Sequence, residues 1–198
     1  MVCWRFQSAL AGLAISPSCQ TETAISNLKV PKSPSSIELS RAETELLTET
    51  GREYFLRTCL ERTQLPESVV ILLDCPPSLG ILAVNCLATA GGLLTVVQPG
   101  GFELHALIHL EMTVRVIQER IQPDLQVLGA IVTNAHRRRA ITEQVAVEVA
   151  RVSPVLGIVR SDARMLYATT AGRILEITRS KALDDYARVA RRLRDEVL

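Results

Sequence analysis

The residues of this 198-residue chain with the clearest chemical potential lie at positions 72–80, in the string LLDCPPSLG. Asp74 directly follows the apolar run 69–73, which is typical of a strand buried on both faces of a parallel sheet. Ligands bind such sheets at the carboxyl ends of the strands. A carboxylate there can hold magnesium through water beside the phosphates of a nucleotide. An ordinary turn built on Asp74 and two prolines is the alternative interpretation.

A basic cluster, His136 followed by three arginines, lies between a predicted strand and a predicted helix. One interpretation is a solvated loop, and the other is contact with the phosphate backbone of nonspecific DNA. The formal net charge is only +1, so no overall field draws the chain toward nucleic acid. Three consecutive arginines stand out against that background, which favours the DNA interpretation.

The histidines and cysteines do not form a metal site by spacing. His105 and His109 share a helix face, but no third ligand is evident, so we expect surface or partner-facing residues. The cysteines show no CxxC pair, which suits a reducing compartment and a cytoplasmic protein. No apolar run is long enough to span a bilayer. The cysteines are Cys3, Cys19, Cys59, Cys75 and Cys86.

The elements that must position these residues alternate between strand and helix. Such alternation predicts an α/β fold, a three-layer parallel sheet with helices on both faces. We expect an irregular or poorly ordered segment at 1–33, because 16–38 is rich in Ser, Thr and Pro, and one α/β domain at 34–198. The predicted strands are 69–73, 93–97, 125–133 and 155–159, and the predicted helices are 79–90, 104–120, 141–152 and 183–197.

The string around Asp74 resembles the second Walker motif of the ParA/Soj-type partition ATPases, relatives of MinD. Further segments match that family in order and at its spacing, and collinear matches are more specific than one motif. The resemblance covers roughly 34–198 and implies an incomplete P-loop NTPase fold of the ParA/MinD type. The matching segments are 36–43, 51–54, 94–104, 122–134 and 180–186.

The family's Gly-rich phosphate loop, the Walker A loop, has no counterpart here. No GxxxxGK[ST] string occurs, and lysine stands only at positions 29, 32 and 181. Residues 7–15 resemble the stretch that follows this loop in the family. We therefore interpret the chain as N-terminally truncated by about one strand and one helix, and as unable to hydrolyse ATP. The missing strand would lie between the strands 69–73 and 93–97, which must either pair directly or leave a gap that recruits another chain.

The resemblance also implies site residues. ATP and magnesium are the family's cofactors, although we expect this chain to bind neither. The family positions for the cofactor fall on Asp74, Pro76, Asn134 and Arg160, with Asp74 holding magnesium through water. Val159 replaces a proline that lies along the base, and Asn134 is equally well interpreted as a turn residue. The DNA-binding positions are Arg137, Arg138, Arg139, Arg160, Arg164 and Arg173.

The function implied is partition of plasmid or chromosome DNA, with nonspecific DNA and a ParB-like adaptor as partners. A homodimer or a full-length ParA-like subunit is a further expected partner, and no membrane is involved. DNA binding would place the protein on the nucleoid. The alternatives are a nucleotide-independent module that binds DNA or a partner, and a non-functional gene fragment.

Overall fold

A computed structural model of the chain describes residues 2–6, 22–25, 28–31, 43–62, 70–75, 78–136, 140–173 and 176–197. The chain divides into two compact units. The first comprises 1–2, 92–115 and 126–198, and the second comprises 3–91 and 116–125. Within the described ranges, no helix combines the length and apolar character needed to cross a membrane.

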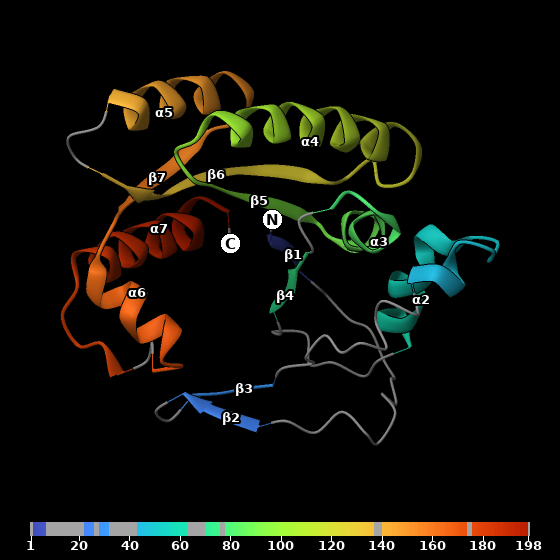
Figure 1. Cartoon of the computed structure of the whole chain (residues 1–198). Helices are drawn as coiled ribbons and strands as arrows, with labels where there is room; N and C mark the ends of the chain where they lie inside the picture. Colours follow the sequence, from blue (N-terminus) through green and yellow to red (C-terminus); the bar gives the residue numbers. More distant parts are fainter. Residues whose placement is uncertain are drawn as a thin grey trace. The chain divides into compact units, whose positions relative to one another are not determined.

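The first unit is built on three parallel strands. These are β5 (Gly92–Val97), β6 (Gln126–Ala135) and β7 (Val155–Arg160), with Val97 aligned with Val132 and Val132 with Ile158. In Figure 1, α4 (Gly101–Arg120) and α5 (Ala140–Val152) run along one face of these strands, and α7 (Lys181–Val197) runs along the other. The predicted parallel α/β sheet with helices on both faces is therefore confirmed.

The position of α7 follows from its residue pattern and from one glycine. Its buried residues, Ala182, Asp185, Val189 and Leu193, recur at helical spacing and make one stripe. Gly157 of β7 lies beneath this stripe, and a Cβ built on it would lie 2.5 Å from Cγ2 of Val189. The missing side chain therefore lets α7 approach β7 closely.

The second unit contains η1 (Arg52–Tyr54), α2 (Phe55–Glu61), β4 (Val70–Asp74) and α3 (Ile81–Thr89). The buried Asn85 of α3 joins these helices. Its Nδ2 donates to the carbonyls of Arg52, at 2.7 Å, and Ile81, at 2.9 Å, while its Oδ1 accepts from the backbone N–H of Leu56 at 2.9 Å. A buried side chain with all these bonds made orients η1 and α2 on α3.

Three short strands fall within residues 1–33, where the sequence indicated an irregular segment. They are β1 (Val2–Phe6), β2 (Glu22–Ile25) and β3 (Leu28–Pro31), and the last two pair antiparallel. β1 is the neighbour of β4 in the sheet, so β4 has a partner strand that was expected from the sequence to be absent. The division of the chain at residue 33 stays a prediction.

Candidate functional site

Asp74 is the last residue of β4, as predicted, and its side chain is exposed. The next residue, Cys75, is buried, and Pro76 lies outside the described residues. A hydrogen bond with Cys75, burial, and the neighbouring charges of Cys75 and Asp74 together raise the pKa of the Cys86 thiol far above its ordinary value. Asp74 is thus an accessible carboxylate close to the buried Cys75 and the half-buried Cys86.

Asn134 and Arg160 come together at the carboxyl ends of two neighbouring strands. Ala135 of β6 is aligned with Arg160 of β7, and the N–H of Ser161 donates to the carbonyl of Ala135 at 2.9 Å. Asn134 has a φ of 53°, in the left-handed region that asparagine tolerates better than most residues, and its side chain is exposed. This geometry accommodates both interpretations of Asn134, a turn residue and a ligand contact.

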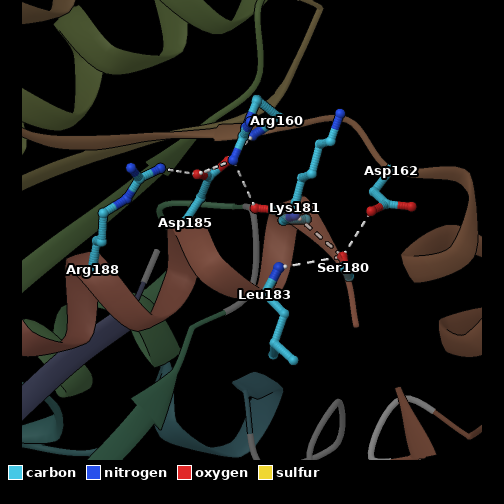
Figure 2. A network of polar contacts seen from close by, with 8 residues as sticks. Arg160, Asp162, Ser180, Lys181, Leu183, Asp185 and Arg188 are labelled. Atoms are coloured by element: carbon cyan, nitrogen blue, oxygen red, sulfur yellow. Dashed lines mark hydrogen bonds and ion pairs between the residues drawn. The ribbon is translucent and has the colours of Figure 1, made fainter. Parts of the chain in front are cut away.

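The Arg160 side chain is held by α7. Its Nε donates to Oδ2 of Asp185 at 2.7 Å and its Nη2 donates to Oδ1 at 2.8 Å, which makes the interaction bidentate. Nη2 also donates to the carbonyl of Lys181 at 3.2 Å, and the Arg160 N–H donates to Oδ2 of Asp185 at 3.0 Å. Arg188 contacts Oδ1 of the same carboxylate (Figure 2). Arg160 therefore fixes the end of β7 to α7, and Nη1 is its only nitrogen without a hydrogen-bond partner in the described parts of the chain.

Two further residues connect the start of α6 (Ala163–Thr170) with the start of α7. Asp162 caps α6, because its Oδ1 accepts from the N–H of Arg164 at 2.9 Å. Its Oδ2 accepts from the Ser180 hydroxyl at 2.8 Å. The Ser180 oxygen in turn accepts from the N–H groups of Ala182 and Leu183, at 3.2 and 3.3 Å (Figure 2). One interaction thus joins two helix N-termini.

The predicted DNA-binding arginines separate into groups. Arg137, Arg138 and Arg139 lie outside the described residues. Arg164 and Arg173 line one cavity of about 590 Å³ between α6 and the segment that leads into α7. Arg160 is engaged in the Asp185 interaction instead. The full lining is Ala163, Arg164, Tyr167, Ala168, Arg173, Glu176, Ile177, Thr178 and Arg179.

Helix α6 and the roles of Arg179 and Asp185 were not predicted from the sequence. Arg160 and Arg164 were interpreted only as site positions implied by the resemblance, and the capping residue Asp162 and the helix-forming residues after it were not considered. Arg179 and Asp185 gain their roles from partners distant in the chain, and no local pattern reveals such partners.

Comparisons with known proteins decide the family. The model of the AAA domain matches residues 10–127, more than half of the chain. The chain belongs to this AAA domain family. Among curated relatives, it is 37% identical over 116 residues to the chromosome partitioning protein ParA of Myxococcus xanthus, an alignment that covers 59% of this chain and 41% of that protein. It is 36% identical over 140 residues to the chromosome-partitioning ATPase Soj of Treponema pallidum, and this alignment covers 71% of this chain and 54% of that protein.

The resemblance to ParA/Soj-type partition ATPases is therefore confirmed, and the chain spans about half the length of the curated relatives it matches. Among solved structures, a putative plasmid partition protein from Borrelia burgdorferi bound to AMPPNP has a TM-score of 0.69 at 13% identity, covering 83% of this chain and 64% of that one. The cell division ATPase MinD of Pyrococcus furiosus has a TM-score of 0.55 at 17% identity, and the match covers 72% of this chain and 58% of that one. At these identities the likeness concerns the fold.

A structure of cobyrinic acid a,c-diamide synthase from Mycobacterium smegmatis, with ADP and magnesium bound, is 26% identical, with a TM-score of 0.56 over 71% of this AAA-domain chain and 63% of that one. The residues of this chain provide only part of what binding ADP and magnesium requires. Asp74 offers an exposed carboxylate, but the described part of the chain holds no cluster of three or more metal-binding side chains. The sequence shows no lysine-bearing phosphate loop, and Arg160 is bound to Asp185. We therefore derive no reaction step through a nucleotide.

Proposed function

We propose that this chain is a partition protein of the ParA/Soj type that binds DNA without hydrolysing ATP. Its relatives are partition proteins, and its sequence contains no GxxxxGK[ST] string. The observation that carries the proposal concerns Arg160, which the resemblance assigns to the cofactor. Its side-chain nitrogens Nε and Nη2 donate to Asp185 and Lys181, so they hold β7 to α7 and are not left for a nucleotide.

DNA binding would rest on Arg137, Arg138 and Arg139, supported by Arg164. Arginine contacts to phosphates are independent of sequence and weaken steeply as salt rises. Without an ATP-driven clamp, the affinity should lie in the nonspecific range, on the order of 10⁻⁴ to 10⁻⁶ M. A ParB-like adaptor and a homodimer or full-length ParA-like subunit are the partners proposed, and the nucleoid is the proposed location.

The nucleotide part of the proposal is tested by calorimetry and phosphate release with Mg-ATP, on the parent chain and on Asp74→Ala. We expect no hydrolysis above background and no tight binding by either protein. Micromolar affinity for ATP in the parent, lost in Asp74→Ala, would contradict this part of the proposal.

The DNA part is tested by titrating a short labelled duplex at several salt concentrations. A triple variant with alanine at 137, 138 and 139 should bind more weakly, with a salt slope smaller by about 0.9 for each phosphate that an arginine no longer neutralises. The control carries alanine at Arg151, Arg191 and Arg194, exposed arginines elsewhere, and so removes the same charge. Equal weakening in both triple variants would show that net charge alone is responsible, against the proposed site.

A further inference from the structure

The cavity between α6 and the segment 176–180 has the features of a binding site for a peptide. It is an open surface groove of about 590 Å³, because most of its lining residues are exposed. All its lining residues belong to the first unit of the chain. Its walls combine small or apolar side chains, Ala163, Ala168 and Ile177, with the ring of Tyr167.

Tyr167 is the most exposed aromatic residue among the described side chains, at 75%. Burying a tyrosine removes a large apolar surface while its hydroxyl keeps a polar partner, which is why tyrosine is enriched at protein interfaces. Tyrosine and arginine also dominate the residues that contribute most to binding energy at interfaces. Here they line the same cavity.

The charge of the cavity favours an acidic occupant. Three arginines line it against one glutamate. Glu176 binds Arg173, with Nε of Arg173 2.8 and 2.9 Å from its two carboxylate oxygens. Within the described ranges, neither Arg164 nor Arg179 forms an ion pair: Nη1 of Arg164 donates to the carbonyl of Arg179 at 3.4 Å, and its charge is close enough to Asp162 to help lower the pKa of that carboxyl. Two guanidinium groups thus remain to pair with carboxylates.

The backbone of the same wall favours a peptide over nucleic acid. Residues 177–180 belong to no helix or strand. The N–H groups of Ile177, Thr178 and Arg179 and the carbonyls of Ile177 and Thr178 have no hydrogen-bond partner within the described part of the chain. A peptide that lies alongside can satisfy such groups with its own main chain, as in strand addition. A DNA backbone offers no matching row of donors.

We propose that this cavity binds an acidic peptide segment of a partner protein, with one aromatic or large apolar side chain inserted against Tyr167 and flanking carboxylates on Arg164 and Arg179. Arg164 is shared with the proposed DNA contacts, whereas Tyr167 and Arg179 take no part in them, so variants at Tyr167 and Arg179 distinguish peptide binding from DNA binding.

The test uses fluorescence anisotropy of the whole chain with a labelled peptide of aspartate and glutamate around a central phenylalanine. Tyr167→Ala and Arg179→Ala should each weaken binding at least about five-fold, the level of a significant interface residue. Replacing the central phenylalanine by serine should have a similar effect. Leu166→Ala, at an exposed position of α6 outside the cavity, and Arg191→Ala on α7 should bind the peptide as the parent does.

Thermal unfolding of each variant verifies its fold. Ala163→Leu provides a second approach, because it fills the cavity from an exposed position and leaves Tyr167 and the arginines in place, and it should abolish peptide binding. Three results would overturn the proposal: equal binding of the peptide by the parent, Tyr167→Ala and Arg179→Ala; equal binding of a lysine peptide; or failure of the acidic peptide to bind while a DNA duplex depends on Tyr167 and Arg179.

Discussion

The carboxylate of Asp185 on α7 binds both the backbone N–H and the guanidinium of Arg160 at the end of β7. Asp185 is 2% exposed, and the Arg160 side chain is 27% exposed. A carboxylate so deeply placed is stable only with such partners, since burying an unpaired charge is strongly unfavourable. The arrangement positions α7 and at the same time determines where the Arg160 side chain points.

Asp185→Ala should lower the free energy of unfolding by about 1–3 kcal/mol, because the Arg160 N–H and guanidinium lose their acceptor in a partly buried place. Urea unfolding measures the change. Asp195→Ala is the matched control on the same helix: Asp195 also pairs with an arginine, Arg194, but both side chains are at least 60% exposed. Its effect should stay within about 0.5 kcal/mol, and equal effects in the two variants would contradict the special role of Asp185.

The same carboxylate should make stability depend on acid pH. The hydrogen bond with Arg160 lowers the pKa of Asp185 from its ordinary 3.8 to about 2. Because the pKa of Asp185 is lower in the folded state than in the unfolded state, the ionised carboxylate stabilises the fold. This stabilisation is fully present above about pH 4 and is lost as the pH falls toward about 2. Unfolding free energies across that window should fall more steeply for the parent than for Asp185→Asn. A residual slope should remain in the variant, because the Ser180 hydroxyl lowers the pKa of Asp162 in the same direction. Superimposable pH profiles would contradict the link.

Ser180→Ala should destabilise the chain by about 1–2 kcal/mol, the effect of losing a helix cap. Ser180 both caps α7 and donates to Asp162. A double-mutant cycle with Asp162→Ala, followed by thermal unfolding, should show that the two effects are not additive. Strict additivity would mean that the two helix starts are independent.

Gly129→Ala should be far more destabilising than Gly172→Ala. Both glycines have positive φ, 143° and 66°. A Cβ on Gly129 would lie 2.6 Å from the Pro154 carbonyl oxygen and 2.7 Å from Cγ of Leu156, whereas a Cβ on Gly172 meets nothing within 4 Å. Gly172→Ala should therefore show only the backbone cost, about 1–2 kcal/mol. Chemical unfolding of both variants checks the order, and a smaller effect at Gly129 would contradict the close approach of β6 to Pro154.

The Cys86 thiol should resist alkylation in the folded chain. Its hydrogen bond with Cys75 is the largest cause of its raised pKa, followed by burial, and the reactive thiolate is therefore scarce. Mass spectrometry after brief iodoacetamide treatment should find Cys86 labelled in urea and unlabelled in buffer. Rapid labelling of Cys86 in buffer would show that the thiol is neither buried nor held by Cys75.

The order of the main elements could be predicted from the amino-acid sequence alone. The continuous apolar run 93–97, with helical patterns on either side, indicates a buried strand of a parallel sheet. The run 69–73 also forms a strand, but the expectation that it is buried on both faces is wrong, since Leu72 of β4 is 56% exposed. The boundaries of these strands differ from the prediction by only a few residues: β4 is Val70–Asp74 and β5 is Gly92–Val97. Asp74 could be placed at a strand end for the same local reason.

The roles of several polar residues, in contrast, depend on how the chain folds. Arg160 was predicted to bind a cofactor or DNA, but its main partner, Asp185, lies 25 residues away and contacts it only after α7 packs on β7. Arg179 belongs to no recognisable sequence pattern and gains its place from a cavity formed with α6. Hydrophobic periodicity is a property of one continuous segment, so it can be recognised in the sequence. The partner of a charged side chain depends instead on which distant segments the fold brings together.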